Sequence, residues 1–517
     1  MVLTWAHKLF AAVSRPFRGA NITPQNSDWQ PVAMTPDEAI RQSQPLLGNR
    51  SRDSQRNDPA FIAAEEALVS NVIQGGIGIT PAVIIGNEWD EDAADDEAFN
   101  DEAATRFQMW CDTEFEAYGA YPFWMAQQIG IREVAAQGEF FLIRSVNTDP
   151  QRICPLQYQL MSADMLAQYD LFGSARGRGV FDRGILYHEE TGQPISYFFA
   201  RNNRNELLFG QRDVIEVPAD RVIHFFIPQI PGQSRGAGYL SATLQNSTDR
   251  DWLVGNVLTA AAVQAMFTLV HKTNNPMTRG LGAAMASTSS TGKPTVRLGK
   301  GIVSTIGIDE EVTPVQSTQP GPSLDGFIRL LMQLQAMGSR MSYLALTRDY
   351  SQTNYSSAKA AIEADKRSFT TLQMLFGAKL VQPIYAAFLD ATAGAGLFES
   401  VSAKVYWSSR RRWQRAELTL PGFAQLDELK EASAAIARMG SLQSTLRDEL
   451  VRRGLPATAW RRLILQKERE TRLIREASER AGAPIASDAV SMFVGKSLSE
   501  PAQSQQTPAQ GFDGQVL

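Results

Sequence analysis

The side chains that most often carry catalysis are sparse in this sequence of 517 residues. It holds four histidines and two cysteines, which are His7, His188, His224, His271, Cys111 and Cys154. None of them sits in a GxSxG elbow or an HExxH helix, so neither a serine hydrolase nor a zinc protease is indicated. We interpret the histidines as structural. The cysteines are expected to be free thiols in a reducing cytoplasm, with no disulfide framework and no zinc site.

Phosphate-binding and metal-binding patterns are also missing. Lys293 follows a glycine, but Ser287 stands where a P-loop needs its first glycine and Pro294 where it needs Ser or Thr. The run Gly173–Gly179 has the wrong glycine spacing for a dinucleotide loop and reads as a turn. The acidic stretch Glu88–Glu102 carries nine carboxylates but lacks the alternating ligands and central glycine of a calcium loop. The sequence therefore predicts no catalytic residue, no metal and no cofactor, which argues against an enzyme.

Two polar segments remain as candidates for binding. One is a basic cluster around Trp413, formed by Arg410, Arg411, Arg412 and Arg415. Its arginines could contact phosphates while the tryptophan stacks on a base, although a solvated or subunit-interface turn is the favoured interpretation. The other is the loop 344–355 (LALTRDYSQTNY), which lies between two strongly periodic helices. Such loops in compact proteins often carry function.

The composition describes a globular chain with several substructures. Its hydrophobic content is 44%, its charged content 20% and its formal net charge −5. This charge argues against tight phosphate binding over a large surface. Leu253–Val270 is an uncharged run of 18 residues, the lower limit for a bilayer span. Its polar and small residues favour instead a helix packed among neighbours, in this chain or in identical subunits, so no membrane is expected.

The apolar periodicity predicts an α+β fold. A helix should begin with Asp58 as its N-cap and Pro59 in its first turn, and stop at Gly75-Gly76. Residues 79–85 read as a strand. Six further short strands are expected in the runs EFFLIRSV, LQYQLMS, GILYHEE, ISYFFAR, VIEV and VIHFFIP between 139 and 228, with a hairpin turn at Glu190–Gln193.

After Gly238 the pattern becomes mainly helical. Helices are predicted over 241–270, 323–343 and 356–392, with a strand-like run at Gly301–Gly307 in the insert between the first two. Pro383 is expected to kink the third helix. Val401–Trp407 reads as a returning strand, and residues 416–480 as short helices of alternating charge.

Several motifs resemble one family. Asn354–Ala360 (NYSSAKA) closely resembles the NYSSxR-type motif of lambda-like phage portal proteins. SRDSQRND at 51–58 is similar to the family's RSRDL-type segment, and NVIQGGIG at 71–78 to its NVVGxGI-type segment. RVIHFFIPQIPGQSRGAGYL at 221–240 resembles its passage before a long helix. The resemblance spans about residues 50–480.

The resemblance implies an α+β portal fold with an α/β wing, a two-helix stem, an α/β clip insert, a long kinked helix and a helical crown, assembled as a ring that is typically dodecameric. Applied to this sequence, it gives an N-terminal arm (1–50), the wing (51–240), stem helix 1 (241–270), the clip (271–322), stem helix 2 (323–343), a tunnel loop (344–355), a long helix with a return to the wing (356–415), the crown (416–480) and a disordered tail (481–517).

The same resemblance implies which residues would face DNA. In the tunnel loop these are Arg348, Asp349, Tyr350, Ser351, Gln352, Thr353 and Asn354, and Arg340 and Lys359 would be further channel cations. Repetition around a ring would turn one Arg348 into a circle of positive charges, which can steer a duplex without reading its bases.

The expected function is a conduit at the unique capsid vertex for packaging and ejection of double-stranded DNA, bound without sequence specificity. The implied partners are further copies of the chain, the terminase large subunit, the major capsid and scaffolding proteins and a head–tail adaptor. The expected location is the virion, and the host cytoplasm during assembly. Another structural ring such as a head–tail adaptor is the alternative, although adaptors are usually much shorter. A packaging nuclease or ATPase would need a carboxylate metal cluster or a P-loop.

Overall fold

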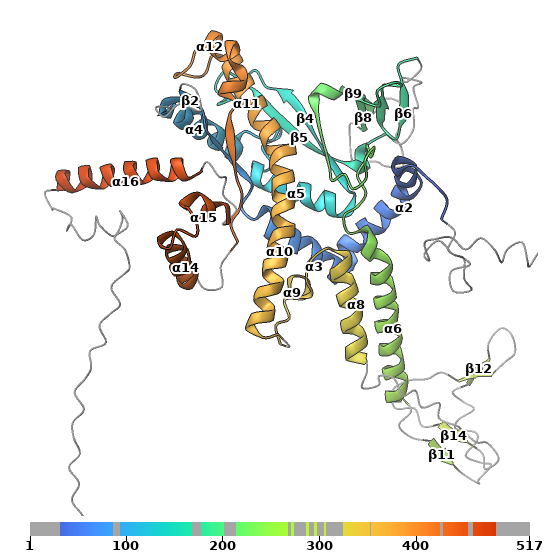
Figure 1. The fold of residues 1–517 in the computed structure, drawn as a ribbon. Coiled ribbons are helices and arrows are strands. Elements are labelled where there is room, and N and C mark those ends of the chain that lie inside the picture. Colours follow the sequence, from blue (N-terminus) through green and yellow to red (C-terminus); the bar gives the residue numbers. More distant parts are fainter. Residues whose placement is uncertain are drawn as a thin grey trace, which may run out of the picture. The chain divides into compact units, whose positions relative to one another are not determined.

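The computed structural model describes most of the chain in two compact units (Figure 1). The described residues are 31–85, 94–167, 177–200, 214–266, 324–351, 353–423, 428–452 and 459–481, with four short strands between 270 and 306. Unit 1 comprises the chain up to Ile73 together with Cys111–Asp365, and unit 2 comprises Gln74–Trp110 and the chain from Lys366 onward. Residues 1–30 of the predicted arm and 482–517 of the predicted tail lie outside the described residues.

Unit 1 opens with two helices that share a capping residue. Helix α2 (Pro36–Asn57) begins with a capping box, in which the Thr35 side chain accepts from Glu38 N and the Glu38 carboxylate accepts from Thr35 N. Asp58 ends α2 and caps helix α3 (Pro59–Leu68), because its carboxylate accepts from Ala60 N at 2.9 Å. The predicted N-cap at Asp58 is confirmed, and α3 continues as a π-helix, η2 (Val69–Ile73).

The prediction of an arm over 1–50 is wrong for its last fifteen residues, which belong to α2. Helix α2 packs against helix α5 (Phe123–Ala136), where Gln44 Nε2 donates to Gln137 O at 2.6 Å. Its apolar periodicity is weak, so tertiary contacts and the capping box rather than an amphipathic pattern define this helix.

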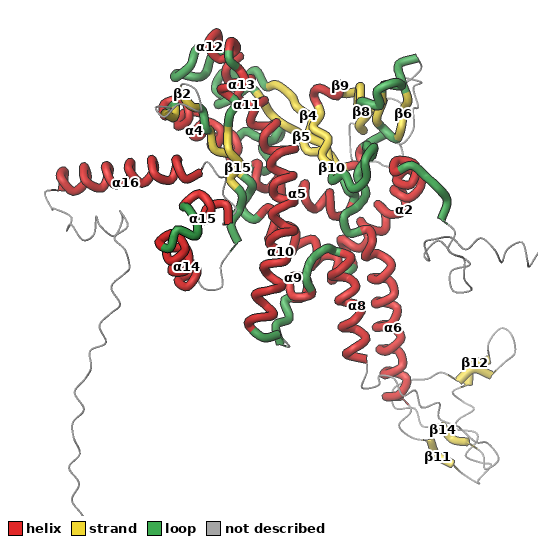
Figure 2. The backbone as a smooth tube through the Cα atoms, in the orientation of Figure 1, coloured by secondary structure: helices red, strands yellow, loops and turns green. Residues whose placement is uncertain are grey.

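Two antiparallel sheets form the body of unit 1 (Figure 2). The first has the order β10-β4-β5, with β4 at Glu139–Val146, β5 at Leu156–Ser162 and β10 at Val222–Phe226. The second has the order β6-β7-β8-β9, with β6 at Val180–Asp182, β7 at Ile185–Tyr187, β8 at Pro194–Ala200 and β9 at Val214–Pro218. All six predicted strands are confirmed. Side chains from both sheets share one core that includes Phe141, Met161, Tyr197 and Phe199.

Two long helices follow the sheets and run side by side (Figures 1 and 2). Helix α6 covers Leu244–Met266 and helix α8 covers Leu324–Gly338, so both predicted stem helices exist but are shorter than expected. Asn246 Nδ2 donates to Leu331 O at 2.8 Å and to Gln335 Oε1 at 3.0 Å, which fixes the helix pair.

The insert between α6 and α8 is described only in four short strands. β11 (Val270–Lys272) pairs in parallel with β14 (Ser304–Ile306), and β12 (Ala286–Thr288) pairs antiparallel with β13 (Pro294–Val296). β14 coincides with the strand predicted at Gly301–Gly307. The rest of the predicted clip 271–322 lies outside the described residues.

A long helical run carries the chain from unit 1 into unit 2. Helix α10 (Tyr355–Phe376) leads through a π-helix, η8 (Gly377–Val381), into helix α11 (Gln382–Gly394). The predicted irregularity is therefore present, and the chain changes its hydrogen-bonding pattern in the turn before Pro383, which occupies the first turn of α11. The run Tyr355–Gly394 is apolar and long enough to cross a bilayer, but 56% of its most apolar window is buried in the protein, as in a core helix.

Unit 2 packs aromatic side chains of helix α4 (Glu97–Thr113) against α11. The Phe107 ring lies 5.1 Å from Tyr385 and 5.2 Å from Phe388. Strand β1 (Gly78–Pro81) pairs with β15 (Ala416–Thr419), and β2 (Ile84–Ile85) with β3 (Ala94–Asp95), so the predicted strand 79–85 is split in two.

The strand predicted at Val401–Trp407 is wrong, because helix α12 spans Ala403–Ser408. The Tyr406 hydroxyl, buried in this turn, donates to Asp390 at 2.8 Å, a long-range contact that a short apolar run does not reveal. The helices predicted within 416–480 are present as α14 (Glu428–Gly440), α15 (Leu446–Arg452) and α16 (Ala459–Ala481), and Gly440 ends α14 as expected.

The shared residue Asp58 gives a test of how α6 is anchored. The Arg250 guanidinium on α6 forms a buried ion pair with the Asp58 carboxylate. Asp58→Asn keeps a side chain that can cap α3 but no longer neutralises Arg250. We expect thermal unfolding to show a loss of about 1–3 kcal/mol. Asp53→Asn, an exposed neighbour on α2, is the control and should change stability by less than about 0.5 kcal/mol; equal losses in both variants would contradict the anchoring role.

Candidate functional site

The segment between α8 and α10 is held more firmly than a polar loop would be. Helix α9 (Tyr343–Thr347) starts at Ser342, whose hydroxyl accepts from Ala345 N at 3.1 Å. Ser342 N and Oγ also donate to the two Asp365 oxygens, at 2.8 and 2.5 Å. Asp365 lies on α10, so the start of α9 is tied to the helix that follows the loop.

The predicted tunnel loop 344–355 is therefore wrong in its first part, which is the helix α9. The loop proper is 348–354. It begins at Arg348, whose left-handed backbone (φ 54°) ends α9. Five residues are too few for a clear helical period, and only the capping contacts with Asp365 show why this helix forms.

The acidic residue of the loop organises it. The Asp349 carboxylate accepts from Ser351 N at 3.0 Å and from the Tyr343 hydroxyl at 3.4 Å. It also lies 3.9 Å from Arg329 on α8. The hydrogen bonds from Ser351 are the main cause of its lowered pKa, which keeps the carboxylate charged. Asp349 thus orders the turn, and Arg348 and Tyr350 are the exposed side chains beside it.

The end of the loop starts the next helix. Asn354 caps α10, because its side-chain oxygen accepts from Ser357 N at 2.8 Å. Thr353 N donates to Tyr350 O at 3.1 Å. Gln352 lies outside the described residues, so its place in the loop is not assigned.

The two further candidate cations are placed differently. Arg340 has a left-handed backbone (φ 58°) at the end of α8, and its guanidinium lies 4.7 Å from the centre of the Tyr239 ring. This is a cation–π contact. Lys359 is exposed in the first turns of α10. Their role as channel cations stays a prediction.

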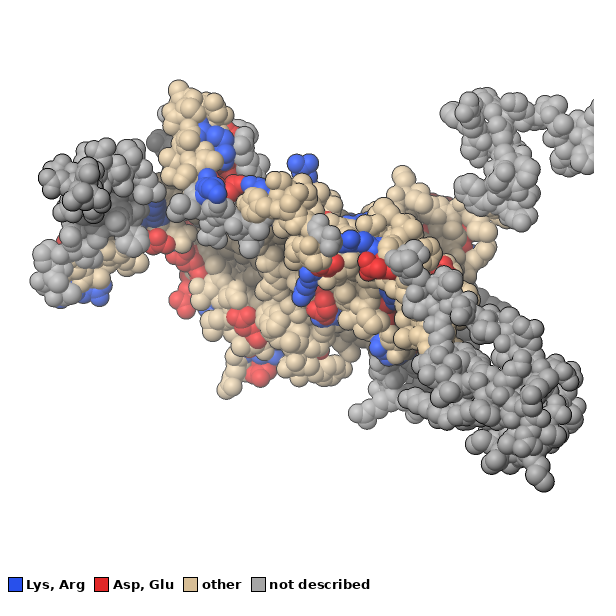
Figure 3. Space-filling model, turned by 90° about the horizontal axis from the view of Figure 1, so that it is seen from below, with Lys and Arg blue, Asp and Glu red and all other residues tan. Residues whose placement is uncertain are grey.

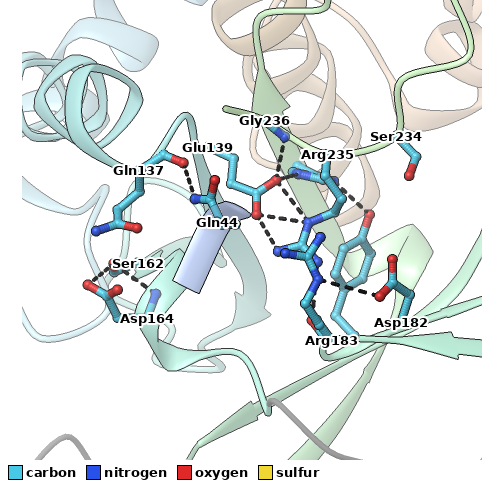
Figure 4. Close-up of polar contacts among 12 residues, drawn as sticks. Gln44, Gln137, Glu139, Ser162, Asp164, Asp182, Arg183, Ser234, Arg235 and Gly236 are labelled. Carbon is cyan, nitrogen blue, oxygen red and sulfur yellow. Dashed lines mark hydrogen bonds and ion pairs between the residues drawn. The ribbon is translucent and has the colours of Figure 1, made fainter. Parts of the chain in front are cut away.

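The passage before α6 is fixed by a buried carboxylate. Figure 4 shows Glu139 next to Arg235 and Gly236. Arg235 Nε donates to the Glu139 oxygens at 2.8 and 3.0 Å, and Gly236 N donates at 2.8 Å. His224 Nε2 lies 3.0 Å from the same carboxylate, so this histidine has the structural role that the sequence suggested.

The electrostatics of this cluster favour the charged form of Glu139. Complete burial by itself raises the pKa of Glu139, but the positive charge of Arg235 and the hydrogen bond with His224 act in the opposite direction and prevail. The pKa of Glu139 is therefore well below its ordinary value of 4.5. A buried charge with a matched partner and several donors is tolerated, whereas the same charge alone is costly.

Close backbone contacts hold the same passage. A Cβ on Gly236 would lie 2.1 Å from Gly138 O, and one on Gly238 would lie 2.4 Å from Ala136 O. Only glycine allows this approach. Ser234 continues the anchoring, because its N and Oγ donate to the Asp37 carboxylate on α2 at 2.9 and 2.8 Å.

The basic cluster near Trp413 is largely engaged in contacts within unit 2. Arg410 Nε donates to Asp390 at 2.8 Å, and Arg412 donates to Ile84 O at 2.9 Å. Trp413 itself is buried, with its ring 4.8 Å from Phe99. A buried tryptophan is not available for base stacking, which supports the turn interpretation.

No metal-ligating cluster of three or more His, Cys, Asp or Glu side chains occurs among the described residues. Cys111 and Cys154 are both buried free thiols, as predicted. On the face drawn in Figure 3, Lys and Arg side chains are interspersed with Asp and Glu and form no broad basic patch among the coloured residues.

The Glu139 cluster predicts a specific response to acid. Because the pKa of Glu139 is depressed in the folded state, its stabilising contribution is complete above about pH 4.5 and is lost as the pH falls further. Glu139→Gln should cost about 3–5 kcal/mol at neutral pH, since Arg235 loses its buried partner. Denaturant unfolding between pH 7 and pH 3 should also show a smaller acid-dependent loss in the variant. Glu216→Gln, which breaks the exposed pair with Arg178, should cost about 1 kcal/mol or less, and an equal cost in both variants would refute the assignment.

The chain was compared with known families and proteins. The sequence model described as "Phage portal protein, lambda family" matches residues 23–373. The chain is 23% identical to the portal protein of Escherichia phage N15 over 474 residues, which cover 84% of this chain and 86% of that protein. It is 22% identical to portal protein B of Escherichia phage lambda over 373 residues, 68% of each chain.

Solved structures give a more distant likeness. Chains from the neck of a native gene transfer agent particle computed with C12 symmetry, and of an empty one computed with C6 symmetry, match with TM-scores of 0.39 and 0.38 and 11% identity. They cover 81% and 83% of this chain and 99% and 96% of their own chains. The family assignment rests on the sequence match, which extends from before α2 into α10. This chain belongs to the lambda family of phage portal proteins.

Proposed function

We propose that the chain forms a ring at the unique capsid vertex, through which double-stranded DNA enters during packaging and leaves during ejection. The proposal is carried by one arrangement: the helix pair α6–α8 leads directly into the braced loop 348–354 and the long helix α10, within a chain of the portal family. The parts named stem, tunnel loop and channel wall from the resemblance correspond to these elements in the same order.

A conduit must guide DNA without holding it. Every phosphate that a protein neutralises adds salt-dependent affinity, so a channel with many cations would retard sliding. A net charge of −5 and one exposed arginine at the loop tip suit weak guidance. In a dodecamer, Arg348 would recur twelve times around the axis and provide a circle of positive charge of defined height.

The proposed partners follow from the same plan. The insert between α6 and α8 would dock the terminase large subunit during packaging and the head–tail adaptor afterwards. The wing would contact the major capsid and scaffolding proteins. The chain would thus be a structural component of the virion that assembles in the host cytoplasm, and the work of translocation would belong to the separate motor.

Electron microscopy of the purified protein tests the central claim. We expect closed rings of identical subunits with a central opening wide enough for duplex DNA. Rings should persist in about 0.5 M salt, at which surface ion pairs are strongly screened. A protein that stays monomeric at micromolar concentration, or one that hydrolyses ATP or cleaves DNA by itself, would refute the proposal.

The loop can be tested without disturbing its frame. Arg348→Asn removes the charge but keeps a residue that tolerates the left-handed backbone. We expect normal rings by electron microscopy and a reduced mass of DNA in particles assembled with the variant, because a circle of guiding charges is lost. The control is Arg221→Asn, an exposed arginine of the wing. Loss of rings in Arg348→Asn would instead identify the loop as a subunit contact.

A further inference from the structure

Helix α8 has two packing faces, and only one is used within the subunit. Leu331 and Gln335 lie on the face that contacts Asn246 of α6. A second set of large apolar side chains is exposed on another side of α8: Phe327, Leu330, Leu334 and Met337, with exposed fractions of 51, 47, 45 and 63%. Their separations of three, four and three residues place them in one stripe along the helix.

Helix α6 has an outer face of unusual composition. Residues 252–266 contain no charged side chain, yet most of 251–262 is exposed in the single chain. Trp252 is 72% exposed and Leu258 is 65% exposed. A helix face that meets water normally carries charged residues, so this face has the composition of one that protein covers.

The outer face of α6 also has room for a second helix. Nothing lies within 4 Å of a Cβ added to Gly255. Thr259 and Ala262 follow on the same side, four and three residues further, and both are exposed. The Thr259 hydroxyl donates to Gly255 O at 2.8 Å, so its polar group is already satisfied and can be covered without an unpaired donor.

We infer that the α8 stripe of one subunit packs against the outer face of α6 in a second copy of this chain. The two surfaces complement each other, since bulky side chains on α8 meet an uncharged face with small residues on α6, and each copy carries both. A contact between two different faces of identical subunits is heterologous, and it closes into a ring when the rotation fits. The inference rests on the proposed ring and adds which faces meet.

Gly255→Trp tests the contact. In a single subunit the new side chain enters open space, and tryptophan is favoured over glycine inside a helix, so the circular dichroism spectrum and the melting temperature of isolated subunits should be unchanged. In the ring it should collide with the α8 stripe, and we expect rings to be lost in electron microscopy and native mass spectrometry. Gly394→Trp, at another glycine with nothing within 4 Å of an added Cβ, is the matched control and should still form rings.

Cross-linking gives a second measurement that does not depend on loss of assembly. The pairing of Asn246 with Leu331 and Gln335 places Gly255 near the level of Phe327 in the antiparallel helix pair. Cys111 and Cys154 are buried, so new surface cysteines react selectively. A short bis-maleimide should join Gly255→Cys subunits to Phe327→Cys subunits when the two are mixed, and should join neither variant to itself.

The outcomes separate this inference from the proposed function. If the unsubstituted protein forms no rings, the proposed function fails. If it forms rings and Gly255→Trp forms them equally well, the ring stands and the assigned faces are wrong. Efficient cross-linking of either single cysteine variant to itself would indicate a two-fold contact and would overturn the head-to-tail arrangement. A monomer that binds phosphatidylcholine vesicles through this face would overturn both.

Discussion

The buried contact between Glu139 and Arg235 joins the sheets of unit 1 to the helices that follow them. Glu139 begins β4, the middle strand of its sheet, and its carboxylate also accepts from Gly236 N just before α6. Since a buried carboxylate needs every one of these partners, the position of the passage 234–240 is set by charge pairing. The direction of α6 follows from this anchor, and the packing of α8 follows from α6.

The same kind of constraint recurs at the loop that should face DNA. Asp365 holds the start of α9, and Asn354 caps α10, so the loop 348–354 is bounded by satisfied polar contacts at both ends. Arg340 adds a contact with Tyr239, which belongs to the anchored passage. A short loop between rigid supports can present Arg348 at a fixed place, which a free polar segment could not do.

Assembly and stability are linked in a chain of this design. A lone subunit exposes apolar side chains on α6 and α8, and water is a poor environment for such surfaces. Burying them against further copies would stabilise the folded subunit by mass action, so its apparent stability would depend on concentration. The absence of a strong positive balance in the sequence fits the same picture, because the ring would be held together by apolar contacts and DNA would be only weakly attracted to it.

The sequence by itself determined the strands of the wing, the cap at Asp58 and the three long helices, because local periodicity and capping chemistry specify these elements. Its motifs also identified the family. Helix α2 carried a readable signal at Thr35–Glu38 that weak periodicity obscured. Only the tertiary structure decided that 344–347 and 403–408 are helical, that Trp413 is buried, and that Glu139 meets Arg235 across 96 residues. These features depend on partners distant in sequence, and a local pattern contains no information about which distant group will satisfy a buried charge or hydrogen bond.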